Sequence, residues 1–499
     1  MLLVLVAGCW SRSTPTPAPG TSKGGDNAPA GELVTAEIQK MNSAPYGRPS
    51  RAFNPGHPTP RSAPKATKTA NGFQVQFASG ATITTPTVYG RAVIVSGGFA
   101  SQELYAFDIK TGDSMWAVDL NDDGPSSPAC ERETCVIATE SCTLFALDAH
   151  TGKHLWSHWL GDPLTSAPSI AGDRVFASYP ASGAEGGDAP PGASHVLAAF
   201  ELRTGKVLWQ MWLDGDVMSA PVAQGEFVYV NTFNGTLIKL EQATGKVRYA
   251  VRAKATSAPV IQFDKGVEQM YYTRRGSEEQ EKKDGAVEMI IRADHNDPET
   301  KWGSSPKAAP HVDDRVQNST EHAKKSKKED ASNGFGDGAP SSANASVAGR
   351  TVGVTSVSSM QNFQGSRIVM LRDRSVNTMG DEVIATSADS GALLWKYKLD
   401  GDVRKDGGFL GTAPLAAGSS VLFGTLKGDV VRLDQKSGKT IAKYGVGSPV
   451  RSQPIVHDGW IYVGTDDGRL VAIDTKDKSL TGWPTWGGNA QRTGIGINK

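Results

Sequence analysis

The chain has 499 residues, and its 52 Lys and Arg balance its 52 Asp and Glu, so the formal net charge is zero. A nucleic-acid-binding protein would carry a basic excess, and this sequence has none. Glycine is abundant at 56 residues and hydrophobic residues make up 38%, which favours short strands joined by tight turns over helical bundles. No apolar run reaches the roughly 18 residues that indicate a membrane-spanning helix.

The first nine residues resemble a bacterial lipoprotein signal. Met1–Val6 is apolar, and Ala7-Gly8-Cys9 follows, a pattern of small residues before a cysteine that becomes the lipidated N-terminus. A basic segment before the apolar run is missing, so the alternatives are a start further upstream or a chance match. The residue after Cys9 is Trp10, not the aspartate that often marks inner-membrane retention. The resemblance therefore implies an outer-membrane lipoprotein that faces the periplasm.

Residues 10–72 are rich in Pro, Ser, Thr, Gly and Ala and contain few large apolar residues. Such a segment cannot bury enough apolar surface to fold. We therefore expect a signal peptide at 1–9, a disordered tether at 10–72 and a folded domain at 73–499.

A repeated phrase organises the remaining chain: an acidic residue, two variable residues, Thr-Gly, and an aromatic residue four positions after the glycine. The four closest copies contain Gly112 with Trp116, Gly152 with Trp156, Gly205 with Trp209, and Gly245 with Tyr249. Looser copies contain Trp395 and Ala442, and a degenerate unit ends at Trp302. Self-similarity at a period near 40 residues is the signature of a repeat architecture.

Each period contains four short strand patterns, which is the content of one propeller blade. Thr-Gly forms a tight turn in which glycine takes positive φ, and the tryptophan on the outer strand fills the gap to the next blade. We therefore interpret these glycines and tryptophans as structural. The predicted units are approximately 83–120, 126–162, 165–216, 218–255, 256–302, 339–402, 411–448 and 451–494.

These units predict an all-β fold, an eight-bladed β-propeller of four-stranded antiparallel blades. The segment Phe73–Phe77 precedes Pro86 as an outer strand precedes the next unit. We expect this N-terminal strand to complete the last blade and close the ring, which hides both edges.

The phrase Asp-x-x-Thr-Gly-x-x-x-Trp resembles the repeat of pyrroloquinoline-quinone (PQQ) enzymes and of BamB-like lipoproteins of the outer-membrane β-barrel assembly machinery. The ending at 482–494 is also similar to a segment of such proteins, and the resemblance covers 73–494 with a break at 303–338. It implies a scaffold that binds another protein through a propeller face. The alternatives are a PQQ-dependent dehydrogenase and a ligand- or polysaccharide-binding sensor or adhesive module.

In the dehydrogenases of that family, two adjacent cysteines form a quinone platform, and Glu, Asn and Asp serve Ca²⁺ and base catalysis. This sequence has four cysteines and no adjacent pair, and no acidic cluster matches the calcium ligands. Its nine histidines show no metal-ligand spacing, and no hydrolase or nucleotide-binding motif is present. We therefore expect no catalytic residue, no metal and no cofactor.

Cys130 and Cys135 flank the short turn 131–134. Export permits a disulfide, and if the flanking strands pair, the two cysteines lie directly opposite one another. We expect this disulfide, with Cys142 free. The alternative is three unbridged thiols.

The loops before each Ser-Pro or Ala-Pro should gather on one face of the ring, around the mouth of the central channel. The residues of this possible partner face are Asp162, Asp216, Asp402, Arg404 and Arg451. The charged insert at 303–338 is either a disordered surface loop or an arm that contacts the partner.

Overall fold

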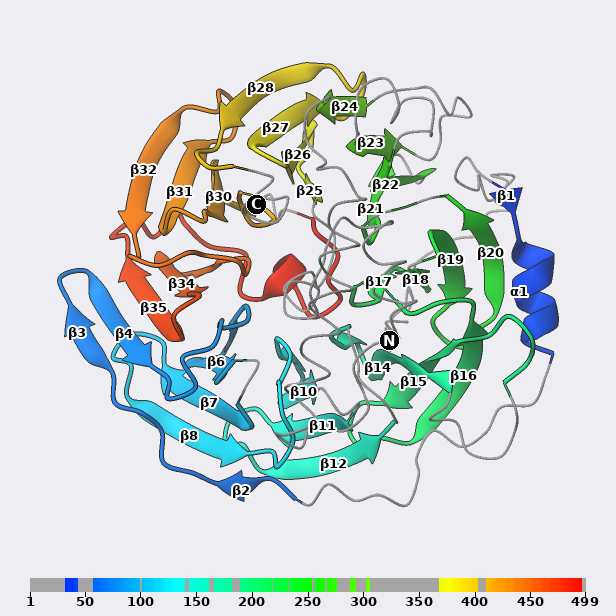
Figure 1. Cartoon of the computed structure of the whole chain (residues 1–499), viewed down its shortest axis with the longest axis horizontal. Helices are drawn as coiled ribbons and strands as arrows, with labels where there is room; N and C mark the ends of the chain where they lie inside the picture. The colour runs from blue at the N-terminus through cyan, green and yellow to red at the C-terminus, as the bar shows by residue number, and fades with distance from the viewer. Residues whose placement is uncertain are drawn as a thin grey trace, which may run out of the picture.

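The computed structural model describes residues 32–43, 57–98, 101–139, 143–160, 166–181, 189–217, 219–232, 234–253, 255, 257–264, 267–275, 288–292, 302–305, 368–402 and 410–495. Within these ranges the strands form eight antiparallel sheets placed around a common centre (Figure 1). In each sheet one strand lies nearest the centre and the strands that follow it in sequence lie further out; in three sheets, strands from the N-terminal part of the chain are added at the outer edge. The alternation of short apolar strands and tight turns along the sequence therefore builds a ring of blades.

Three sheets have five strands. The first joins β2 (Thr59–Pro60), β8 (Ser114–Asp119), β7 (Glu103–Asp108), β6 (Ala92–Ser96) and β5 (Thr87–Tyr89). The second joins β1 (Glu32–Leu33), β20 (Val247–Arg252), β19 (Thr236–Glu241), β18 (Phe227–Asn231) and β17 (Val222–Gln224). The third joins β3 (Thr67–Thr69), β4 (Gly72–Gln76), β35 (Arg469–Asp474), β34 (Trp460–Gly464) and β33 (Ile455–His457).

The other sheets have four strands each. They are β9 (Ala129–Glu131), β10 (Thr134–Ala138), β11 (Thr143–Asp148) and β12 (His154–Trp159); β13 (Ser169–Ala171), β14 (Arg174–Pro180), β15 (His195–Glu201) and β16 (Val207–Leu213); β21 (Val260–Asp264), β22 (Val267–Arg275), β23 (Glu288–Arg292) and β24 (Trp302–Ser305); β25 (Ile368–Met370), β26 (Arg374–Met379), β27 (Glu382–Ser387) and β28 (Leu393–Lys398); and β29 (Leu415–Ala417), β30 (Ser420–Gly424), β31 (Asp429–Asp434) and β32 (Thr440–Gly445). One α-helix, α1 (Thr35–Met41), and one 3₁₀ helix, η2 (Trp486–Gly488), complete the described elements.

The prediction of an eight-bladed ring of four-stranded blades is wrong. β1, β2 and β3 each add a fifth strand to a sheet. In the sheet β21–β24, only the backbone of the two outer strands, β23 and β24, is described. The other seven sheets have outer strands whose side chains are described. The physical reason for the fifth strands is that an outer strand exposes unpaired N–H and C=O groups, which an extended segment can pair with.

The prediction of a disordered tether over 10–72 is also wrong for the described part of that range. β1, α1, β2 and β3 all lie within it, on the outside of the ring (Figure 1). Val34 and Ile38 are each 2% exposed and join a core cluster with strands β16 and β20. We call this segment the strap (residues 32–43 and 57–69); backbone pairing holds both of its parts, and Val34 and Ile38 also pack the first part against the ring.

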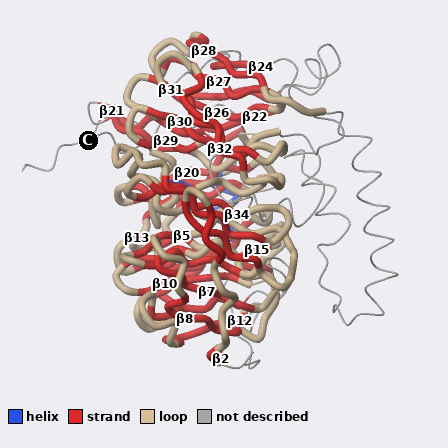
Figure 2. The backbone as a smooth tube through the Cα atoms, turned by 90° about the vertical axis from the view of Figure 1, so that its left-hand side faces the viewer, coloured by secondary structure: helices blue, strands red, loops and turns tan. Residues whose placement is uncertain are grey.

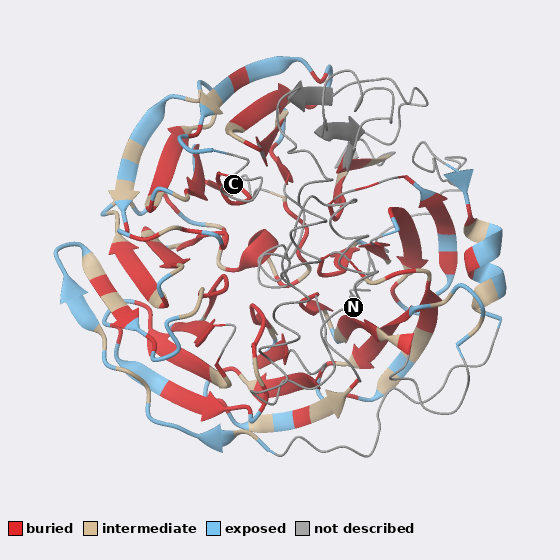
Figure 3. Cartoon of the chain, viewed as in Figure 1, coloured by how far each residue is buried: buried red, intermediate tan, exposed pale blue. Residues whose placement is uncertain are grey.

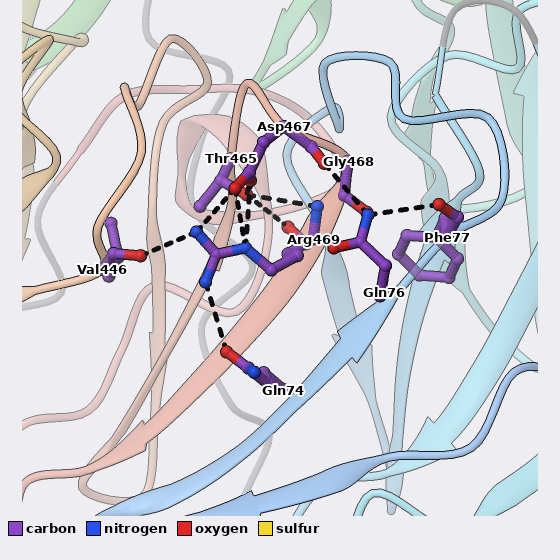
Figure 4. Close-up of polar contacts among 8 residues, drawn as sticks. All are labelled: Gln74, Gln76, Phe77, Val446, Thr465, Asp467, Gly468 and Arg469. Atoms are coloured by element: carbon purple, nitrogen blue, oxygen red, sulfur yellow. Dashed lines mark hydrogen bonds and ion pairs between the residues drawn. The ribbon is translucent and has the colours of Figure 1, made fainter.

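The ring closes where β4 pairs with β35, with Gln74 opposite Val471 and Phe73 opposite Ala472. This is the closing N-terminal strand expected from the sequence. Arg469 and Gln76 bridge the joint through side-chain hydrogen bonds (Figure 4). The N-terminal and C-terminal parts of the propeller therefore share one sheet.

The apolar core lies between neighbouring sheets, and burial decreases outward (Figure 3). Inner and middle strands such as β6 and β30 are buried throughout, whereas outer strands such as β28 and β32 are mainly exposed. Seen from the side, the strands run between two faces that carry the loops (Figure 2). Function must therefore use one of the two faces, the outer rim or the centre.

Candidate partner-binding surfaces

The tryptophans of the repeat lie between neighbouring blades. The indole Nε1 of Trp116 donates to the carbonyl of Ala149 (3.2 Å), that of Trp156 to Leu202 (2.8 Å), and that of Trp395 to Gln435 (2.9 Å). Trp209 donates in the same way to Gln242 (2.8 Å). In each case the acceptor belongs to the next blade.

The glycine of the next repeat lies against each of these rings. A Cβ on Gly152 would be 2.7 Å from Trp116, and one on Gly205 would be 2.7 Å from Trp156. The same relation holds for Gly245 with Trp209 and for Gly438 with Trp395. The glycine of each Thr-Gly turn therefore also packs against the tryptophan of the preceding blade. These contacts hold neighbouring blades together.

The closing joint replaces the tryptophan. Gly112 has φ +74°, and a Cβ there would be 2.7 Å from Phe73 on β4 and from Ala66 of the strap. The N-terminal strand thus supplies Phe73 where the four joints described above use a tryptophan. The side chain of Trp302 lies outside the described residues.

The mouth of the ring is the face reached by the connections from each outer strand to the next inner strand. Because strands alternate in direction, all these connections lie on one face, opposite the Thr-Gly turns. Asp162 and Arg404 lie outside the described residues. The other three residues predicted for this face come from three separate connections: Asp216, Asp402 and Arg451.

These three residues have different surroundings. The carboxylate of Asp216 lies 3.6 Å from the His195 ring, and both side chains are largely buried. Arg451 is half-exposed and donates to Asp466 over 3.0 Å. Asp402 is exposed. Asp402 and Arg451 are accessible to a partner, whereas Asp216 is largely enclosed by the protein.

Other acidic residues of the mouth hold its turns. The Asp122 carboxylate accepts from Thr139 (2.7 Å), and that of Asp214 accepts from Thr232 (3.0 Å) and Thr236 (2.5 Å). The shared arrangement is an aspartate of one connection bound to a threonine of the neighbouring hairpin. These carboxylates keep the mouth rigid.

The centre of the ring holds the C-terminal segment, residues 483–494 (Figure 1). Its carbonyls accept hydrogen bonds from the innermost strands of five sheets. The pairs are Val88 with Pro484 (2.7 Å), Ile170 with Ala490 (2.9 Å), Ala223 with Gln491 (3.0 Å), Met370 with Gly494 (3.1 Å) and Val456 with Trp483 (2.8 Å). The segment thus satisfies backbone groups that face the channel. The sequence predicted this ending as part of the last unit, 451–494, and did not predict its position at the centre of the ring.

Arg492 anchors this segment at the centre. Its side chain is fully buried, and Nη2 donates to the carbonyls of Ser127 (3.2 Å) and Pro168 (3.5 Å) in two different blades. Nη1 donates to the carbonyl of Trp486 (3.1 Å). Burial lowers the pKa of Arg492 to about 9. Carbonyl dipoles therefore stabilise this buried charge and tie the segment to the blades.

A shallow pocket of about 410 Å³ lies beside the C-terminal segment. Its polar side chains are all uncharged: Gln224, Gln242, Asn489, Gln491 and Thr493. The Gln242 amide donates to Gly225 and Phe227 carbonyls, both 3.0 Å away. None of the residues lining this pocket is an Asp, Glu, His, Cys, Lys or Arg.

Cys130 and Cys135 form a disulfide across the β9–β10 hairpin, with their Cα atoms 4.1 Å apart. Cys142 lies outside the described residues. Within the described ranges, no group of three or more His, Cys, Asp or Glu side chains is placed to hold a metal ion, and no helix there is long and apolar enough to cross a membrane. The hairpin disulfide does not join adjacent residues, so it does not match the quinone platform, and we derive no step through a quinone.

The chain matches the sequence profile of the family described as outer membrane protein assembly factor BamB over residues 75–187, 192–323, 348–441 and 380–486. No curated protein sequence matches it. Among solved structures, BamB from Moraxella catarrhalis is 16% identical with a TM-score of 0.48, covering 82% of this chain and 97% of that chain.

Quinohemoprotein alcohol dehydrogenase from Comamonas testosteroni is 12% identical with a TM-score of 0.53, covering 83% of this chain and 77% of that one. The corresponding enzyme ADHIIG from Pseudomonas putida HK5 is also 12% identical, with a TM-score of 0.51, and covers 91% and 84%. At these identities the likeness shows the propeller fold alone.

Proposed function

This chain belongs to the family of the outer membrane protein assembly factor BamB, and from this premise we propose that it is a non-catalytic scaffold that binds another protein through the mouth of its propeller. We further propose that it acts in outer-membrane β-barrel protein assembly, as a lipoprotein anchored through Cys9 and facing the periplasm. No cofactor is part of this proposal.

The observation that carries the proposal is the position of the C-terminal segment. It takes up backbone hydrogen bonds of the innermost strands in five sheets, and Arg492 fastens it to two blades. The chain itself thus occupies the part of the channel that these strands line. The remaining described surfaces are faces and rims, which suit a protein partner. A rigid ring also loses little conformational entropy on association.

The mouth supplies exposed charges on fixed turns. Asp402 is exposed, and Arg451 is held by Asp466, while Asp122 and Asp214 fix other turns of the same face. Charges on a rigid surface steer and orient a complementary partner. We therefore propose Asp402, Arg451 and the undescribed Asp162 and Arg404 as partner contacts.

Site-specific photocrosslinking tests this proposal. A photoreactive residue in place of Asp402 should crosslink an outer-membrane assembly protein in intact cells. The matched control is a photoreactive residue in place of Lys206, which is exposed on the opposite face in a Thr-Gly turn. Equal crosslinking from both positions, or crosslinking from Lys206 alone, would place the partner elsewhere.

Cys9→Ala should move the protein from the membrane to the soluble periplasmic fraction.

The dehydrogenase alternative has a direct test of its own. Two similar structures are quinohemoprotein alcohol dehydrogenases, although the likeness is one of fold. We expect no dye reduction with alcohols or sugars when the purified protein is supplied with PQQ and Ca²⁺. Stoichiometric PQQ binding with turnover would overturn the scaffold proposal.

A further inference from the structure

The outer strands pair with their inner neighbours in equivalent registers. The strap shows what the outward edge of such a strand can bind. In β8 the residue after Trp116 is Ala117, whose carbonyl accepts the backbone N–H of Arg61 (2.9 Å). In β20 the residue after Tyr249 is Ala250, whose carbonyl accepts the backbone N–H of Val34 (2.9 Å). The backbone of the residue that follows the aromatic position therefore points away from the ring.

Side chains on the same two edges are opposite in charge to the side chains of the strap that covers them. Three residues after the aromatic position, β20 carries Arg252, which binds Glu32 (3.0 Å) and Glu37 (2.8 Å) of the strap. At the equivalent position β8 carries Asp119, which binds Arg61 of the strap. Each covered edge therefore combines an outward backbone with a charge that is opposite to the charge of its occupant.

β28 presents this arrangement with no fifth strand paired to it among the described residues. Lys396 follows Trp395, and Lys398 stands three residues after it, in the position of Arg252. The pairing confirms the equivalence, because Lys396 lies opposite Ile384 as Ala250 lies opposite Ile238.

The side chains of β28 are open to solvent. Leu393 is 57% exposed and Leu394 is 45% exposed. The Lys396 and Lys398 side chains are each 60% exposed, and their partners within the sheet are Glu382 and Asp381. This edge therefore offers apolar contact beside two accessible positive charges.

We infer that the outer edge of β28 binds an extended acidic segment of a second protein as a fifth strand. The Lys396 N–H and C=O form the backbone pair, and Lys398 binds a carboxylate of the segment as Arg252 binds Glu32. The two lysines also disfavour pairing of this edge with its own copy, because like charges would face each other. The inference goes beyond the proposed function, since it uses the rim and not the mouth.

Fluorescence anisotropy with the full chain tests the inference. One labelled peptide alternates valine and glutamate, and its matched control alternates valine and lysine. We expect the acidic peptide to bind at least about tenfold more tightly than the basic one. Equal affinity of the two peptides for the wild-type protein would overturn the inference.

Lys396→Pro removes the outward N–H while leaving the pairing to β27. It should weaken binding of the acidic peptide at least about tenfold. Ser157→Pro is the matched control, because Ser157 follows Trp156 at the same register on β12, and it should leave the affinity unchanged. Unaltered affinity in Lys396→Pro would overturn the inference.

The double variant Lys396→Glu/Lys398→Glu tests the charge without a proline, and the thermal melting curve reports its folding. It should prefer the basic peptide over the acidic one. Arg451→Glu should leave peptide binding unchanged. If Arg451→Glu abolishes binding and the β28 variants do not, the segment binds at the mouth, so the rim inference fails while the proposed function stands.

Discussion

Arg469 on β35 donates from Nη1 to the side-chain carbonyl of Gln74 on β4 over 3.2 Å, across 395 positions of sequence. The same guanidinium donates from Nη2 to the carbonyl of Val446, on the connection from the preceding blade (3.0 Å), and from Nε to the Asp467 carboxylate (2.9 Å). One side chain therefore ties the N-terminal strand, the last blade and its neighbour together (Figure 4).

We predict that Arg469→Met weakens the whole ring. Arg469 is mostly buried, and its removal leaves the Val446 carbonyl without this donor. Hydrogen bonds to charged groups contribute about 1.5–3 kcal/mol each, so a loss of roughly 2–3 kcal/mol is expected in urea unfolding. Arg451→Met is the control, because it removes a half-exposed ion pair worth about 0–1 kcal/mol. Equal losses in the two variants would contradict the role of Arg469 in closure.

Acid should weaken the last blade through Asp477. Hydrogen bonds from Ser479 and Arg432 lower the pKa of Asp477 to about 2. A carboxyl with a depressed folded pKa contributes stability above its unfolded pKa of about 4, and this contribution is lost as the pH falls toward 2. Asp477→Asn should therefore show a shallower fall in melting temperature between about pH 4 and 2. If the melting temperature of Asp477→Asn falls as steeply with pH as that of the wild type, Asp477 is not the group responsible.

Glycine substitutions should separate backbone strain from blade packing. Gly205 has φ +69°, and a Cβ there would be 2.7 Å from Trp156. Gly80 has φ +61° but nothing within 4 Å of the same position. Gly80→Ala should cost about 1–2 kcal/mol from strain alone, and Gly205→Ala about 1–3 kcal/mol more from overpacking. Similar free energies of unfolding for the two variants would show that the packing around Trp156 adjusts to the added methyl group without cost.

The repeated phrase was sufficient to predict antiparallel four-stranded units but not the added fifth strands, because it records only local requirements. Gly152 needs positive φ and an open face for Trp116, and both needs appear as fixed spacing in the sequence. The hairpin disulfide was predictable for the same reason, since Cys130 and Cys135 flank a short turn. The closing strand was predictable from its order, because Phe73–Phe77 stands before the first unit.

The strap and the C-terminal segment escaped prediction because their contacts are long-range and made through the backbone. The strap buries only Val34 and Ile38 completely among its described residues, and strand pairing by two residues leaves no periodicity. Arg492 has φ +60° and contacts carbonyls of distant blades, which a spacing pattern does not record. Of the predicted mouth residues, Asp402 and Arg451 are accessible, whereas Asp216 is largely enclosed.

The strap should detach without unfolding the ring. Ile38 on α1 is 2% exposed in a cluster with β16 and β20, whereas Lys40 on the same helix is exposed. Ile38→Asp buries an unpaired carboxylate, which is strongly unfavourable. Limited proteolysis should therefore cleave the strap of Ile38→Asp rapidly and leave the propeller intact, while Lys40→Asp resists like the wild type. Rapid cleavage of both variants, or of neither, would contradict the packing of this helix.

The buried Arg492 side chain should hold the C-terminal segment in the ring. Arg492→Ala removes the donors to the carbonyls of Ser127, Pro168 and Trp486 and leaves a buried cavity. Unpaired buried carbonyls cost about 1–3 kcal/mol each, so the variant should lose at least about 3 kcal/mol of unfolding free energy. Gln491→Ala is the control, because Gln491 is half-buried and its side chain donates to Glu131 over 3.3 Å. Near-ultraviolet circular dichroism should also change for Arg492→Ala, since Trp483 and Trp486 lie in the same segment. If Arg492→Ala and Gln491→Ala unfold at the same urea concentration, the buried guanidinium does not hold the segment in the ring.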